Sequence, residues 1–276
     1  MMTQQNEAAA NAVYSKSGIE LHTAADFAGM RKAGQLAAQT LDMITEHVQP
    51  GVTTEELDRL CHLFITKNGA IPAPLNYKGF PKSICTSINH VVCHGIPGDR
   101  VLVEGEVLNI DVTVILDGWH DVTSRMYYVG EKIPVKARRL CEITYDCLMA
   151  GIDVVKPGAT LGDVGYAIQE IAHKNRFSVV QDFCGHGLGR TFHAPPSVLH
   201  FGEPGQGEVL EAGMFFTIEP MINAGKYATK ILPDGWTAVT KDRSLSAQYE
   251  HSLAVTDDGF EIFTLSPQGF TRPPYG

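Results

Sequence analysis

Apolar residues recur at helical spacing in four stretches of the chain. These stretches cover 23–49, 53–67, 133–152 and 160–175. All but 133–152 begin with a threonine that is followed three residues later by an acid, which is the spacing of a helix cap. Turn residues end them or separate them, such as Pro50-Gly51. The pattern therefore predicts two pairs of amphipathic helices.

The intervening segments read as short strands joined by turns. The segments 71–105 and 178–265 are rich in Pro and Gly and contain short apolar runs. The order is two helices, strands, two helices, strands, so we expect an α+β fold of two similar halves that share a sheet. Residues 1–20 are expected to form a flexible arm, 21–265 a single catalytic domain and 266–276 a loose tail.

One hairpin allows side-chain positions to be derived. The strand 107–116 is followed by Asp117-Gly118, a two-residue turn signal, and the chain returns over 119–129. If Leu116 pairs with Trp119, alternation divides the hairpin into two faces. The core face carries Leu108, Ile110, Val112 and Val114. The other face carries Asn109, Asp111 and Thr113, opposite His120, Val122 and Ser124.

Composition narrows the class of protein. The chain has 276 residues, 22 Lys and Arg against 31 Asp and Glu, and a net charge of -9. This acidity argues against a nucleic-acid surface. No apolar run is long enough for a membrane span, and the N-terminus does not resemble a secretion signal. The six scattered cysteines form no CxxC pair, so we expect free thiols and a cytoplasmic protein.

Four polar residues lie within or beside predicted apolar strands. They are Asp111, His186, Glu219 and Glu250. Taken alone, a strand aspartate is equally well explained by hydrogen bonds to nearby hydroxyls and amides. Taken together, three acids and one histidine form an oxygen-rich ligand set that suits Mn, Fe, Co or Zn in an open hydrolytic site.

Five motifs in order resemble the type I methionine aminopeptidases of the bacterial type, over about Ile19 to Leu265. The motifs are Val92–Pro97, Asn109–Thr113, Gly185–Arg190, Phe216–Pro220 and Ser246–His251. The resemblance implies the pita-bread fold and removal of the initiator methionine from nascent proteins whose second residue is small. It also implies two divalent metal ions, a monomer, and contact with the ribosome.

The resemblance assigns roles residue by residue. Asp111, His186, Glu219 and Glu250 match metal ligands, and Glu219 is also the candidate proton shuttle. His94 and His193 match the histidines that contact the substrate around the scissile amide. The pocket for the methionine side chain matches Tyr77, Phe80, Cys85, Phe192 and Trp236. A plain core role for these aromatic residues stays open.

The sequence departs from the family at Val122, where a second, bridging aspartate is expected. Asp121 stands one residue earlier, and alternation points it into the core. Three outcomes stay open: a β-bulge near 120–123 that turns Asp121 toward the metal, a weakened or mononuclear site, or a site without catalytic metal. The last would leave a pita-bread module that binds peptides or proteins without catalysis.

Overall fold

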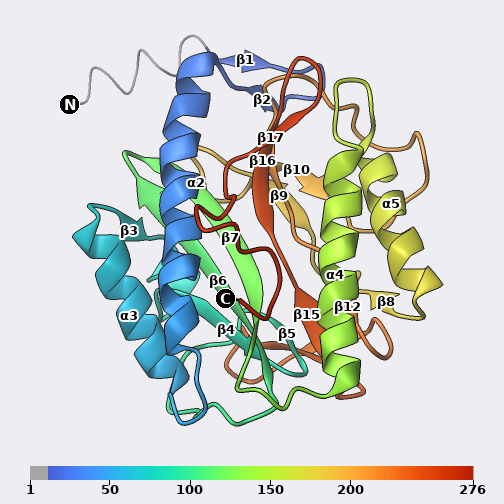
Figure 1. Cartoon of the computed structure of the whole chain (residues 1–276). Helices are drawn as coiled ribbons and strands as arrows, with labels where there is room; N and C mark the ends of the chain where they lie inside the picture. Colours follow the sequence, from blue (N-terminus) through green and yellow to red (C-terminus); the bar gives the residue numbers. More distant parts are fainter. Residues whose placement is uncertain (1–11, 276) are drawn as a thin grey trace.

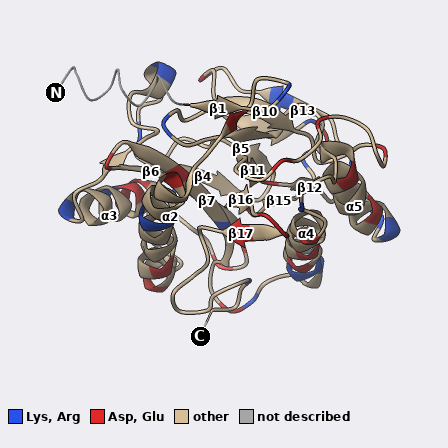
Figure 2. Cartoon of the chain, turned by 90° about the horizontal axis from the view of Figure 1, so that it is seen from above, with Lys and Arg blue, Asp and Glu red and all other residues tan. Residues whose placement is uncertain are grey.

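Two pairs of helices lie along one side of the strands in the computed structural model, which describes residues 12–275 (Figures 1 and 2). The pairs are α2 (Ala24–Ile44) with α3 (Thr54–Lys67), and α4 (Val135–Asp153) with α5 (Leu161–Lys174). Short 3-10 turns are η1 (Thr45–His47) and η2 (Tyr77–Gly79). The predicted helices are confirmed, although the first ends earlier than expected and continues into η1. No helix among residues 12–275 has the length and apolar character needed to span a membrane.

The predicted caps explain where three of these helices begin. At α5, the Thr160 backbone N–H donates to the Asp163 carboxylate at 2.7 Å, and the Asp163 N–H donates to the Thr160 hydroxyl at 3.2 Å. At α3, the Thr53 hydroxyl accepts from the Glu56 N–H at 3.2 Å. The start of α2 has the same reciprocal arrangement as α5. Each cap satisfies backbone donors that have no partner within the helix.

The strands form five small sheets that curve around one another. The two-stranded sheet is β1 (Val13–Tyr14) with β2 (Glu20–Leu21). The largest has the order β10 (Ala194–Val198), β9 (Gly185–Gly187), β11 (Phe215–Ile218), β16 (His251–Val255), β17 (Phe260–Ile262). Two sheets have three strands each. One has the order β15 (Ser246–Gln248), β12 (Met221–Asn223), β8 (Ser178–Val179). The other has the order β13 (Thr229–Ile231), β14 (Ala238–Thr240), β5 (Val91–Cys93). The four-stranded sheet has the order β3 (Ile71–Pro72), β6 (Val107–Leu116), β4 (Cys85–Ile88). Its fourth strand, β7 (Trp119–Tyr128), also pairs with β6.

The β6–β7 hairpin has the register that the sequence predicts. Its turn residues Asp117 and Gly118 have φ of 52° and 79°, as a two-residue hairpin turn requires. The ladder runs without a shift from Leu116–Trp119 to Val107–Tyr128. The β-bulge considered near 120–123 is therefore absent, and that possibility is contradicted.

The two halves of the molecule join where β7 meets the start of β16. Ser124 and Glu250 exchange backbone hydrogen bonds of 3.3 and 3.1 Å. On either side of this junction lies one apolar core. The first packs α2 and α3 against β6 and β7, and the second packs α4 and α5 against β11, β12 and β16. This confirms two αβ halves around shared strands.

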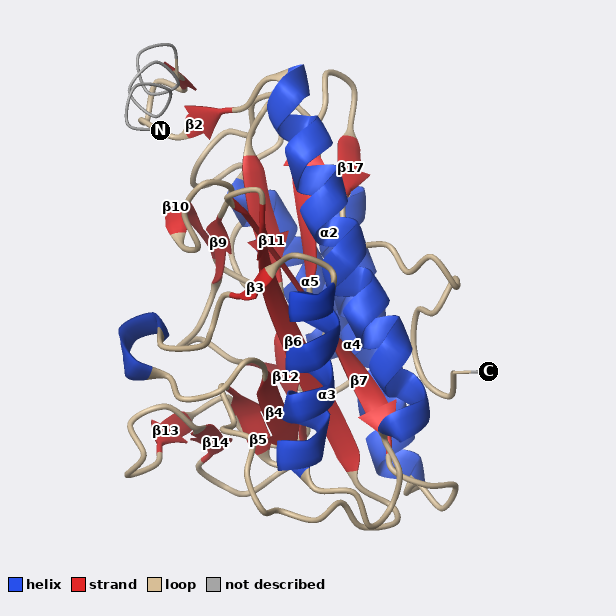
Figure 3. Cartoon of the chain, turned by 90° about the vertical axis from the view of Figure 1, so that its left-hand side faces the viewer, coloured by secondary structure: helices blue, strands red, loops and turns tan. Residues whose placement is uncertain are grey.

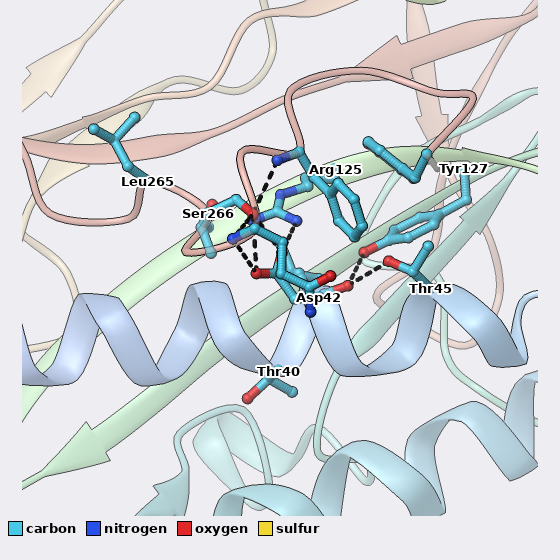
Figure 4. Close-up of polar contacts among 12 residues, drawn as sticks. Thr40, Asp42, Thr45, Arg125, Tyr127, Leu265 and Ser266 are labelled. Carbon is cyan, nitrogen blue, oxygen red and sulfur yellow. Dashed lines mark hydrogen bonds and ion pairs between the residues drawn. The ribbon is translucent and has the colours of Figure 1, made fainter.

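The C-terminal segment is packed, which corrects the expectation of a loose tail over 266–276. Asp42 of α2 pairs with Arg125 of β7, and each side chain is 3% exposed. The Ser266 hydroxyl donates to both oxygens of that carboxylate, at 2.8 and 2.9 Å (Figure 4). Farther on, the Tyr275 hydroxyl donates to the Met126 carbonyl at 2.8 Å. The Asp42 carboxylate can accept more hydrogen bonds than Arg125 donates, and donors from the C-terminal segment supply them, which holds this segment in place. Residue 276 lies outside the described residues.

The expected N-terminal arm is also ordered over the part that the structure describes. Residues 1–11 lie outside it, but 12–20 include β1 and the start of the β1–β2 hairpin. Ile19 is 5% exposed and contributes to the second core. Burial of the Ile19 side chain in this core explains why the polar segment around it packs against the domain.

The buried ion pair gives a direct prediction about stability. Asp42→Ala leaves the Arg125 guanidinium buried without its partner, so we expect the free energy of unfolding to fall by about 3–5 kcal/mol. Asp146→Ala is the matched control. Asp146 of α4 forms an exposed ion pair of 2.9 Å with Arg272 of the C-terminal segment, and the substitution removes it. That change should cost less than about 1 kcal/mol. Chemical denaturation measures both, and equal losses would contradict the role given to Asp42.

Candidate active site

A cavity of about 610 Å³ lies between the two halves and contains nearly all the predicted site residues. Two of the strands that border it, β9 and β10, lie on the side of the molecule away from α2 and α3 (Figure 3). Its walls include the four predicted metal ligands, both predicted substrate histidines and the predicted pocket residues: Asp111, His186, Glu219, Glu250, His94, His193, Tyr77, Phe80, Cys85, Phe192 and Trp236. Among the predicted residues, Asp121 is the exception.

Strand pairing places several of these side chains in one row across the sheet. Cys85 of β4 pairs with Asp111 of β6, which pairs with Ser124 of β7, which bridges to Glu250. Directly paired residues have Cβ atoms about 4.5–5.5 Å apart on one face. The row therefore links the acid of the first half to an acid of the second, with a hydroxyl between them.

Three of the predicted ligands converge closely enough to hold one metal ion. One ligand atom each from His186, Glu219 and Glu250 lies within 4.8 Å of the others. His186 Nδ1 is 3.0 Å from the Gly187 carbonyl, which can only accept, so Nδ1 carries the proton. Nε2, which is 3.8 Å from Glu219 Oε1, is left with its lone pair free to bind a cation.

A second layer of hydrogen bonds orients Glu219. The Thr217 hydroxyl donates to Glu219 Oε1 at 3.0 Å, and Gln248 Nε2 donates to Oε2 at 3.2 Å. The Glu219 backbone N–H donates to His200 Nε2 at 3.0 Å. Thr217 and Gln248 belong to the recognised motifs, so their positions could be expected from strand alternation. His200 was missed, because nothing in its local sequence signals a distant partner.

Three acids of the cavity, Asp111, Glu219 and Glu250, lie in surroundings that disfavour their charged forms. Burial raises the pKa of Asp111 to about 7, and burial together with Asp111 raises the pKa of Glu219 to about 8. Burial and then Glu219 raise the pKa of Glu250. None of the three pairs with a Lys or Arg in the part of the chain that the structure describes. Buried carboxylates beside an unprotonated imidazole are a fitting ligand set for a divalent ion.

The two predicted substrate histidines, His94 and His193, both line the cavity and have different neighbours. His193 Nδ1 is 3.0 Å from the Tyr77 hydroxyl, and its ring packs on Phe192 at 4.2 Å. Desolvation, with His186 nearby, lowers the pKa of His193 to about 3. His94 has a positive φ of 56° and its ring lies 6.3 Å from Trp236, and burial lowers its pKa. Both imidazoles are therefore neutral near pH 7.

The apolar part of the cavity is built from aromatic rings and thiols. Phe80 and Trp236 meet edge to face at 5.2 Å, and Tyr77 contacts Phe192 at 4.8 Å. Cys85 is 6% exposed and lies in the same wall. Cys93, which the sequence left open as a cavity residue, also lines it, as do Pro74 and Phe183, which were not predicted. Such a lining suits a thioether side chain.

Asp121 points away from the cavity, which corrects its tentative assignment as a metal ligand. It pairs with Val114 on the core face, it is fully buried, and among residues 12–275 neither carboxylate oxygen has a hydrogen-bond partner. It packs so closely against α2 that a Cβ placed on Gly34 would be 2.8 Å from its Oδ2. Val122, which pairs with Thr113, lines the cavity instead.

Comparisons with known proteins agree with this geometry. The model of metallopeptidase family M24 matches residues 28–257. The methionine aminopeptidase of Rickettsia prowazekii is 64% identical over 258 residues, which cover 93% of this chain and 99% of that protein. Its crystal structure superposes with a TM-score of 0.89 over 90% of this chain and all of that chain. The Thermotoga maritima methionine aminopeptidase, 36% identical, has a TM-score of 0.87 over 89% of this chain and 99% of that one.

The buried Asp121 carboxylate should make stability depend on pH. Burial raises its pKa well above the usual range, so the folded state holds a proton that the unfolded state releases. The free energy of unfolding should therefore fall as the pH rises above about 4, by up to about 1.4 kcal/mol per pH unit. Asp121→Asn removes this contribution, so the variant should gain stability over the parent as the pH increases.

Urea denaturation of both proteins between pH 5 and pH 8 measures the difference. Asp146→Asn, at an exposed carboxylate, is the control and should follow the parent at every pH. Parallel profiles for Asp121→Asn and the parent would contradict a buried, protonated Asp121.

Proposed function

The chain belongs to metallopeptidase family M24 and has the pita-bread fold, and we infer from its cavity that it is a methionine aminopeptidase. It removes the initiator methionine from nascent proteins whose second residue is small. The observation that carries this inference is the position of three converging ligands, His186, Glu219 and Glu250, beside a wall of aromatic rings and thiols. No observation favours the alternative of a binding module without catalysis.

The enzyme depends on a divalent metal ion, as a member of this family. We propose that Mn, Fe, Co or Zn is held by His186, Glu219 and Glu250, because that ligand set accepts each of them. The second ion that the resemblance implies would need a carboxylate at position 122, on the cavity face of β7 near Asp111, and Val122 stands there. The residues present therefore fit one ion well and a second one poorly.

Each polar side chain of the cavity then has a chemical task. An ion bound there supplies a Lewis acid and acidifies water near neutral pH. Glu219 accepts the proton of the attacking water and passes it to the leaving amine. The Tyr77 hydroxyl donates to His193 Nδ1, which leaves Nε2–H to donate to the developing oxyanion of the scissile carbonyl. His94 positions the amide.

We also propose that residues 21–265 act as one catalytic domain, because the cavity takes Asp111 from one half and His186, Glu219 and Glu250 from the other. Its substrates are the N-termini of nascent chains, and we propose that it acts on them in the cytoplasm, as a monomer and in contact with the ribosome. All six cysteines are free, which supports a reducing compartment.

The proposed activity is tested with tripeptides. Protein freed of metal with a chelator and then titrated with Mn or Co should release the first residue of Met-Ala-Ser and leave Leu-Ala-Ser essentially intact. The reason is that the unbranched thioether of methionine fits the aromatic wall. Release that does not depend on metal, or equal release from both peptides, would contradict the assignment. No release at any metal concentration from folded protein would make the binding module the better interpretation.

The role of His193 gives a second prediction. His193→Ala removes the donor to the oxyanion, so kcat for Met-Ala-Ser should fall by on the order of a hundredfold while the melting temperature changes little. His173→Ala, at an exposed histidine in the last turn of α5, is the control and should retain the parent kcat. A parent-like kcat in His193→Ala would show that His193 takes no part in the reaction.

A further inference from the structure

We propose that the Asp111 carboxylate binds the free α-ammonium group of the substrate directly, beside a single divalent ion on His186, Glu219 and Glu250. The resemblance implies that Asp111 is a metal ligand, so this assignment gives it a different role. It rests on the proposed function and identifies how the enzyme recognises a chain terminus.

The first support is the separation of Asp111 from the metal cluster. Ligand atoms of His186, Glu219 and Glu250 converge within 4.8 Å, and Asp111 is not in that group. Along its row, Asp111 is flanked by the Cys85 thiol and the Ser124 hydroxyl, neither of which is an anionic oxygen ligand.

The second support is the side chain in the adjacent position of β7. Val122 pairs with Thr113 on the cavity face, two residues along β6 from Asp111. On its other side it contacts β16, where the Val122 N–H donates to the Ser252 hydroxyl at 3.3 Å. A carboxylate at 122 would stand between the strands of Asp111 and Glu250 and could share a cation with both. Two methyl groups cannot, so an ion at Asp111 would lack the carboxylate that joins it to Glu250.

The third support is that Asp111 faces the cavity without a partner. Within residues 12–275 its side chain takes part in no hydrogen bond or ion pair, although it is largely buried. A buried carboxylate needs donors or a positive charge. A primary ammonium group brings three N–H donors and one charge, and needs no further protein ligands.

Charge balance favours the same arrangement. The cavity is lined by four carboxylates, those of Asp111, Asp182, Glu219 and Glu250, and by the ammonium group of Lys78, so one divalent ion leaves a single negative charge. One ammonium group then cancels the remaining charge. In a site with little water, a neutral assembly costs less than one with an excess charge of either sign.

The neighbours of Asp111 also fit the geometry of an N-terminal methionine. Cys85, its direct partner on β4, belongs to the wall that we assign to the methionine side chain. An amino group and a side chain that leave the same Cα can therefore reach Asp111 and the aromatic wall together. An internal residue of a peptide has no ammonium group to offer, which accounts for cleavage at the terminus only.

The first test counts metal ions on the full chain. Protein freed of metal with a chelator should bind one Mn ion per chain in a calorimetric titration. Metal analysis after dialysis should give the same number. Val122→Asp should add a second ion, because it restores the missing carboxylate. Two tightly bound ions in the parent protein would overturn the proposal.

The second test measures the amino group itself. L-methioninol should bind the one-metal protein on the order of ten- to a hundredfold more tightly than 4-(methylthio)-1-butanol, which lacks the amine. Asp111→Asn should abolish this difference, leave the amine-free ligand unaffected and keep one ion per chain. Asp121→Asn, on the other face of the same hairpin, is the matched control and should behave like the parent.

The outcomes are separable from those of the function test. Equal affinity of the two ligands for the parent protein, or loss of the metal ion in Asp111→Asn, would overturn the proposal even if Met-Ala-Ser is cleaved. Amine-dependent binding in a protein that cleaves neither tripeptide would support the ammonium site and remove the proposed function.

Discussion

The unbroken pairing of β6 with β7 is the constraint on which the active site depends. Because side chains alternate along a strand, one register decides which residues of the hairpin meet the cavity and which meet α2. The observed register sends Asp111 and Val122 to the cavity, and Asp121 and Arg125 to the helix. A shift of β7 by one residue would turn Asp121 toward the cavity and Val122 toward α2.

The same hairpin also joins the two halves chemically. Its outer strand β7 bonds to the backbone of Glu250, so the acid of the first half and the ligands of the second are set at a fixed spacing. The ligands share a second layer, in which Thr217 and Gln248 hold both oxygens of Glu219. The cavity therefore forms only where the two halves meet, because each half contributes part of its lining.

Much of this arrangement could be predicted from the sequence. The helix caps, the hairpin turn and its register follow from local rules, and the site residues lie within motifs that those rules place on strands. Three features could not be predicted in the same way. The absence of a bulge at Asp121 depends on whether the core tolerates a protonated carboxyl beside Gly34. The partner of His200 and the anchoring of Ser266 on Asp42 are contacts between residues far apart in the chain, which local patterns do not contain.

The anchoring of Ser266 also bears on when the protein becomes fully folded. Asp42 lies in α2, but its hydroxyl donor is Ser266 and a backbone donor is Gln268, more than 220 residues farther along the chain. During synthesis the buried ion pair with Arg125 therefore lacks these donors until residues 266–268 have left the ribosome. An enzyme that acts on other nascent chains thus completes its own packing late in its synthesis.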